Sequence, residues 1–204
     1  MIPLDRISDF RFEISNKMKT RCPWLPADRE LYVEYHDTEW GVASRDARYL
    51  FEMINLEGAQ AGLSWWTVLQ KREHYRKVFH NFVPEKVAKM KDAELEKLVL
   101  DPGIIRHRGK IEAVRANAQA WLELAKREGD PVEWLWSFAG GKPKVNSPKG
   151  MGEIQAKTAE SDALSKALRK AGFNFVGSTT MHAFMQAVGM VNDHTVDCFR
   201  HKKK

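Results

Sequence analysis

Residues 98–111 read LVLDPGIIRHRGKI, and this stretch decides the fold that we predict. Its first apolar residues belong to a helical pattern. The pattern ends at residues 101–103, DPG, because proline and glycine favour turns. A second, longer helix is expected over residues 110–127, where apolar residues again recur at helical spacing. The stretch therefore predicts two helices joined by a short hairpin.

This hairpin carries groups that bind phosphate. Backbone N–H groups at the start of a helix attract anions, and Arg and Lys side chains add positive charge. The candidate contacts are Gly103, Arg106, Arg108, Gly109 and Lys110. The layout is that of a helix–hairpin–helix, which clamps a DNA backbone without reading its sequence. An ordinary helical connection with solvated charges has the same local pattern, so this segment alone leaves both interpretations open.

The rest of the chain also has helical spacing, and the alternation typical of strands is nearly absent. We expect Ser44 and Ser161 to cap helices, Gly58 and Gly62 to end one, and Pro84 to begin one. Further helices are expected over residues 27–36, 64–69 and 177–189, and an exposed loop over residues 139–150. The sequence therefore predicts an all-α fold without a sheet.

Composition limits the classes of protein to consider. The chain has 204 residues, 43% of them hydrophobic, which is enough for one core or for two helical lobes around one cleft. Residues 1–20 carry charges throughout and do not form a secretory signal, and no apolar run approaches the length of a membrane helix. We therefore expect a cytoplasmic protein without a membrane partner. Its net charge of +6 suits a polyanionic partner, although a basic surface also serves solubility alone.

Both cysteines have a histidine nearby in the sequence. Cys22 precedes His36, and His194 precedes Cys198 by one helical turn. Two thiolates and two imidazoles form a soft tetrahedral set that suits zinc, and with every position filled by protein the site would be closed and structural. Asp193 and Asp197 flank the second pair and are candidates to orient the imidazoles. The spacing alone is equally consistent with two reduced cysteines and two surface histidines.

A single carboxylate lies in an apolar and aromatic region. Glu57 stands between Leu56 and small residues, and four of the seven tryptophans occur between residues 24 and 66 together with Tyr32 and Tyr35. Aromatic faces with one carboxylate form a good pocket for a flat cation. A surface acid at a helix end beside a tryptophan-rich core is the alternative interpretation.

Several motifs occur in a fixed order from about residue 22 to residue 198. They are RCPW at 21–24, YHDTEWG at 35–41, LEG at 56–58, QAGLSW at 60–65, GIIRHRGKI at 103–111, FVG at 175–177 and VNDH at 191–194. Together they resemble the DNA-3-methyladenine glycosylase I family. Two positions depart from its pattern, with Ser178 where proline is expected and Pro23 where glycine is common.

The resemblance implies an all-α fold of the helix–hairpin–helix glycosylase superfamily over residues 21–204, with residues 1–20 outside the match. It implies a monomer that excises 3-methyladenine from double-stranded DNA containing alkylated adenine and releases the free base, without a lyase step. It also implies roles for individual residues. One structural zinc ion per chain is expected on Cys22, His36, His194 and Cys198, joining the N- and C-terminal segments. Base recognition is expected from Glu57, Tyr32, Tyr35, Trp40, Trp65 and Trp24, and insertion into the duplex from Leu63.

Two other functions stay open from the residues alone. One is a non-catalytic helix–hairpin–helix DNA-binding module with structural zinc, and the other is a protein-interaction domain held together by zinc. Neither accounts for Glu57 within an aromatic cluster. Lys110 is a formal candidate for a lyase nucleophile, but the resemblance gives it no such role.

Overall fold

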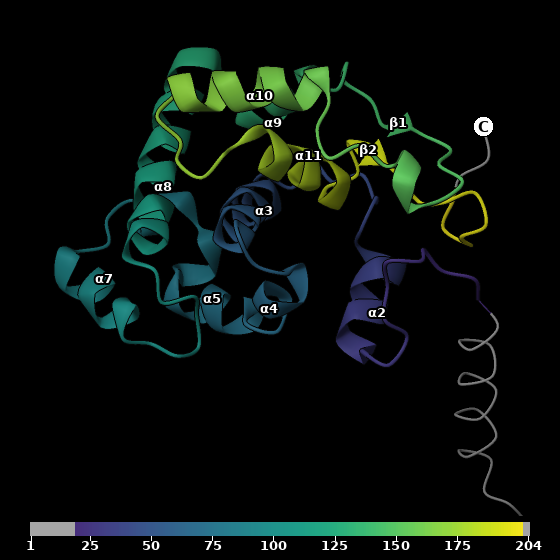
Figure 1. The fold of residues 1–204 in the computed structure, drawn as a ribbon. Helices are drawn as coiled ribbons and strands as arrows, with labels where there is room; N and C mark the ends of the chain where they lie inside the picture. Colours follow the sequence, from purple (N-terminus) through teal and green to yellow (C-terminus); the bar gives the residue numbers. More distant parts are fainter. Residues whose placement is uncertain (1–18, 202–204) are drawn as a thin grey trace, which may run out of the picture.

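The computed structural model describes residues 19–201, so the expected leader at residues 1–20 lies almost wholly outside the described residues. The described part is helical, as the sequence predicts (Figure 1). The helices are α2 (Glu30–Thr38), α3 (Ala47–Gln60), α4 (Trp65–Leu69), α5 (Arg72–Val78), α6 (Pro84–Val87), α7 (Asp92–Val99), α8 (Arg108–Glu128), α9 (Pro131–Ser137), α10 (Ala159–Lys170) and α11 (Ser178–Ala187). Short 3-10 turns are η1 (His80–Phe82) and η2 (Met151–Glu153). Within residues 19–201, no helix combines the length and apolar character that a membrane crossing requires.

Helix α3 forms the centre of the core. Every residue from Leu50 to Ala59 is buried, which is typical of a helix that other elements cover on all sides. Helices α8 and α11 pack against it, and α10 lies on α11 (Figure 1). Gly58 does not end the helix as expected, because the helix continues to Gln60 and uses the missing side chain to pack closely on Phe175.

Two of the expected caps are displaced along the chain. Asp46, not Ser44, caps α3, and its carboxylate accepts a hydrogen bond from the Tyr49 amide at 2.7 Å. Thr158 caps α10 and forms a reciprocal capping box with Ser161, which was expected to be the cap itself. Ser64 caps α4 as predicted. The errors arise because several Ser, Thr and Asp residues compete near each helix start.

The expectation of no sheet is wrong in a small way. Strands β1 (Lys144–Val145) and β2 (Val191–Asn192) pair in parallel. Strand β1 lies within the loop expected over residues 139–150, and β2 follows α11. Each strand is two residues long, too short to show alternation in the sequence. The pairing fixes the segment that leads into His194.

The hairpin between α7 and α8 has the expected helix–turn–helix layout and is braced by α5. His74 Nε2 lies 2.8 Å from the Asp101 carboxylate, and the Tyr75 hydroxyl accepts a hydrogen bond from the Ile105 amide at 3.0 Å. A Cβ at Gly103 would come within 2.3 Å of the His74 ring, so a larger residue there would force that ring to move. In Figure 1 this hairpin and α2 lie on opposite sides of the molecule, with α4 and α5 between them.

Candidate active site and metal centre

The four cysteine and histidine residues predicted to share a metal lie together. Cys22, His36, His194 and Cys198 are all buried, and one ligand atom from each lies within 4.8 Å of the others. Cys22 and His36 come from the start of the described chain and from α2, whereas His194 and Cys198 follow β2. The cluster therefore joins the two ends of the fold.

The surroundings of the two imidazoles fit a metal. Nδ1 of His36 lies 2.8 Å from the Asp37 carboxylate, and Nδ1 of His194 lies 2.9 Å from the Asn192 side-chain oxygen. These contacts leave both Nε2 atoms for the cluster, and Nε2 of His194 is buried without a hydrogen-bond partner among the described residues. Burial lowers the pKa of His194 to about 4, which keeps its ring in the neutral form that metals bind.

The residues that orient the imidazoles differ from those expected. Asp37 and Asn192 hold the rings. Asp193 instead accepts hydrogen bonds from Asn146 and Gln186 at 2.7 Å, and so links β2 to the loop after β1 and to α11. Adjacency in sequence misled the expectation, because consecutive residues in extended backbone point to opposite sides.

A cavity of about 250 Å³ opens between α2, the C-terminal half of α3, α4 and α11. All six residues expected to recognise a base line it, namely Trp24, Tyr32, Tyr35, Trp40, Glu57 and Trp65. A cavity of about 330 Å³ beside residues 144–158 is larger, but its lining contains neither an aromatic ring other than His182 nor Glu57. The smaller cavity therefore has the composition expected for a flat cationic ligand.

Glu57 is the acid of this cavity, and it is only 4% exposed. Its Oε2 atom has no hydrogen-bond partner among the described residues, and burial raises the pKa of the carboxyl to about 8. The indole N–H groups of Trp24 and Trp65 are likewise buried without an acceptor among those residues. Buried polar groups normally have partners, so the Glu57 carboxyl, which lines the cavity, is a candidate partner for a ligand that donates hydrogen bonds.

The aromatic rings form a continuous wall. Trp24 lies edge-on to Trp40 with ring centroids 4.9 Å apart, and Tyr35 lies 5.3 Å from Trp65. Trp40 also contacts His194 at 4.5 Å between centroids. The cysteine–histidine cluster therefore packs against the cavity wall through Trp40, a contact that the sequence did not predict.

Sequence reasoning missed several residues at the cavity. Gln60, Met151, Ile154, Ala183 and Gln186 also line it. Gln60 follows Glu57 by three positions on the same helix, so helical spacing could have identified it. The others come from η2, from the residue that follows it and from α11, and no local pattern relates those segments to α3.

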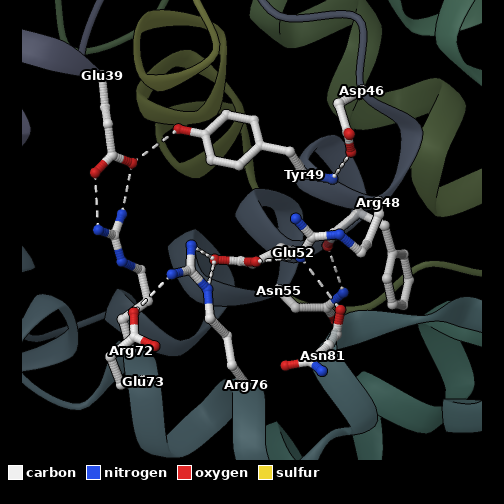
Figure 2. Close-up of polar contacts among 11 residues, drawn as sticks. Glu39, Asp46, Arg48, Tyr49, Glu52, Asn55, Arg72, Glu73, Arg76 and Asn81 are labelled. Carbon is white, nitrogen blue, oxygen red and sulfur yellow. Dashed lines mark hydrogen bonds and ion pairs between the residues drawn. The ribbon is translucent and has the colours of Figure 1, made fainter.

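A partly buried ion-pair network lies behind the cavity on the side of α5 (Figure 2). Arg72 donates two hydrogen bonds to Glu39, at 2.6 and 2.8 Å, and its guanidinium lies 6.0 Å from the centre of the Tyr35 ring. Glu52 is fully buried and accepts hydrogen bonds from Arg76 and Arg48. Figure 2 shows the two pairs side by side, with Tyr49 reaching Glu39 from α3. The network fixes the end of α2, α3 and α5 to one another.

The residues expected to contact DNA occupy different environments. Leu63 is 43% exposed on the loop after α3, and Arg106 is exposed without a hydrogen bond or ion pair to any described residue. Arg108 pairs with Glu96 across the hairpin, at 2.8 Å for its second nitrogen. The Lys110 ammonium donates hydrogen bonds to the backbone carbonyls of Ala59 and Ala61.

These features define a class of helical protein with a basic hairpin, an aromatic cavity holding one buried acid, and a cysteine–histidine cluster. Residues 24–201 match the family model described as methyladenine glycosylase. DNA-3-methyladenine glycosylase 1 of Escherichia coli strain K12 is 55% identical over 179 residues, which span 87% of this chain and 95% of that protein. The chain belongs to the methyladenine glycosylase family.

Solved structures agree with this assignment. A crystal structure of 3-methyladenine DNA glycosylase I matches with a TM-score of 0.88 at 50% identity, covering 90% of this chain and all of the other. A variant of a 3-methyladenine DNA glycosylase I, solved in complex with 3-methyladenine, matches with a TM-score of 0.83 at 36% identity. It covers 86% of this chain and 95% of the other.

Proposed function

We propose that this chain hydrolyses the N-glycosyl bond of 3-methyladenine in alkylated double-stranded DNA and releases the free base. The observation that carries the proposal is the unpaired, buried carboxylate of Glu57 inside an aromatic cavity of the described residues. A purine alkylated at N3 in DNA is a flat cation with an exocyclic amine. It would stack on the rings and donate hydrogen bonds to Glu57.

The proposed reaction needs modest chemical assistance. The alkylated base departs as a neutral molecule, so its bond to the sugar is already weak. The protein must extrude the base, hold it and stabilise an oxocarbenium-like sugar while water attacks. We assign Glu57 to recognition and to electrostatic stabilisation. Leu63, which is exposed on the loop after α3, is assigned to fill the space that the base leaves in the duplex.

The hairpin is assigned to DNA backbone binding. The Lys110 amide is already bonded to His107, so the amides of Arg108 and Gly109 are the first-turn donors left for a phosphate. We expect no lyase step, because that step needs a lysine nucleophile at the sugar and Lys110 does not line the cavity. Zinc, held by Cys22, His36, His194 and Cys198, would supply structural stability and no catalytic water, since protein fills all four positions.

A base-release assay tests the function. Duplex DNA treated with a methylating agent is incubated with the protein, and the released bases are separated by chromatography. We expect 3-methyladenine as the main product, with the DNA strand left uncut at the resulting abasic sites. DNA binding without base release would instead identify a non-catalytic DNA-binding module.

Arg106 provides a test of the proposed DNA surface. Because its guanidinium has no partner among the described residues, we expect it to bind a phosphate and to release counterions. Arg106→Ala should weaken binding of damaged and undamaged DNA alike, and should reduce the slope of log affinity against log salt concentration by about 0.9. Lys126→Ala, at the far end of α8, is the matched control and should leave the slope unchanged. A loss confined to damaged DNA would show that Arg106 reads the lesion.

A further inference from the structure

Lys110 lies in the first turn of α8, yet its side chain reaches the C-terminal end of α3. Its ammonium donates hydrogen bonds to the carbonyl oxygens of Ala59 at 2.8 Å and Ala61 at 2.6 Å. The last carbonyls of a helix have no partner within the helix and carry partial negative charge. Lys110 therefore caps α3 from another element, with two of its three N–H groups.

With these contacts made, Lys110 has few free N–H groups that could bind a DNA phosphate. Its backbone N–H already bonds to the His107 carbonyl oxygen and to the His107 ring. Partial burial of the ammonium also lowers the pKa of Lys110, whereas an ammonium that meets a phosphate on an open surface would stay hydrated. Arg106, which lies on the same hairpin without a partner among the described residues, is the better candidate for a phosphate contact.

The end of α3 carries the groups that meet the base. Glu57 lies in the last turn of the helix, and Gln60 at its end lines the cavity. Leu63 follows on an exposed loop, and its amide bonds back to the Gln60 carbonyl oxygen at 2.6 Å. Both carbonyls that Lys110 holds lie between Glu57 and Leu63 in the sequence.

We infer that Lys110 is a positioning residue, which holds the end of α3 and the Leu63 loop in fixed register with the DNA-binding hairpin. The inference rests on the proposed function, because it assigns the hairpin to the backbone and the cavity to the base. A duplex held at the hairpin then presents its damaged base to Glu57 at one defined distance. Loss of the contact leaves the DNA bound but the base poorly placed.

Two variants of the same hairpin distinguish positioning from phosphate binding. Lys110→Met keeps the length of the side chain and removes its charge and donors. We expect single-turnover excision at saturating methylated duplex to fall at least about tenfold, since small misplacements of a reacting group are costly. The salt slope for undamaged duplex should equal that of the parent. Arg106→Met should lower the slope by about 0.9. Lys126→Met, at the far end of α8, is the control and should change neither the slope nor the single-turnover rate.

Hydrogen exchange gives a second reading of the same contact. In Lys110→Met, the amides of residues 61–64 should exchange faster than in the parent, while amides in the middle of α8 should not change. Melting temperature checks the fold, and Lys110→Gln, which also lacks the charge, replaces Lys110→Met if the latter does not fold.

The inference is overturned if removal of the Lys110 charge lowers the salt slope by about 0.9, because Lys110 would then contact phosphate. It is also overturned if excision and local exchange both match the parent. Failure of the proposed function gives a different result, in which the parent protein itself releases no base from methylated duplex.

Discussion

Cys198→Ala is expected to lower the free energy of unfolding by about 4 kcal/mol or more, the scale seen when a structural metal is lost. The four candidate ligands join Cys22 and α2 to the segment after β2, so a bound zinc ion would close the fold at its two ends. A ligand set reduced to three binds zinc weakly, and Cys22, His36 and His194 would then remain buried around an incomplete site.

The measurements are zinc content per chain and denaturant unfolding. The parent should contain about one zinc per chain when it is purified without chelator, and Cys198→Ala should contain much less. His201→Ala is a matched control, because His201 contacts the His194 carbonyl but belongs to no ligand set among the described residues, and it should retain the metal. Cys198→Ala that is still folded should keep most of its excision rate, although its free energy of unfolding is lower. The cluster supports the cavity wall through Trp40 and does not line the cavity itself. A parent protein that lacks zinc and keeps full activity would refute the assignment.

The fold was largely predictable because its elements are defined by local patterns. The hairpin at residues 98–111, the cap at Ser64 and the proline that starts α6 follow from turn and cap chemistry. The parts that were missed depend on distant partners. Helix α3 passes through Gly58 because Phe175 packs there, and the strands β1 and β2 exist only because two remote segments meet.

The candidate site shows the same division. Motif resemblance gave the six cavity residues and the four candidate metal ligands, and the structure brings each set together. It gave no indication of what each side chain contacts. Lys110 was expected to contact DNA because it is basic and begins a helix, but its position in the sequence could not reveal that its ammonium bonds to the Ala59 and Ala61 carbonyl oxygens at the end of α3. The Glu39–Arg72 and Glu52–Arg76 pairs join residues far apart in sequence, so no spacing rule could have revealed them.

Glu57→Gln is expected to change stability and recognition in opposite directions. Burial raises the pKa of Glu57 to about 8 in the folded protein, from an ordinary value of 4.5. The folded state therefore favours the protonated acid. Its stability is highest below the ordinary pKa, falls as the pH rises from about 4.5 towards 8, and changes no further at higher pH. Glutamine carries no such charge, so the free energy of unfolding of Glu57→Gln should exceed that of the parent by roughly 3–5 kcal/mol near pH 8 and by little at pH 4. Denaturant unfolding at the two pH values measures this difference.

Recognition should weaken in the same variant. A cationic base brought next to Glu57 favours the ionised carboxylate, which accepts hydrogen bonds from the exocyclic amine, whereas the amide of a glutamine side chain offers one acceptor and no charge. The free energy of recognition, measured through excision of 3-methyladenine, should therefore be weaker in Glu57→Gln by about 1.5–3 kcal/mol, the scale of a charge-assisted hydrogen bond.

Glu52→Gln is the matched control, since Glu52 is a buried acid on the same helix that already pairs with Arg76 and Arg48. It should destabilise the fold, because it removes the buried negative charge that pairs with Arg76 and Arg48, whose side chains are 24% and 44% exposed. If Glu57→Gln unfolds with the pH dependence of the parent and excises 3-methyladenine equally well, Glu57 is an ordinary acid at the end of a helix.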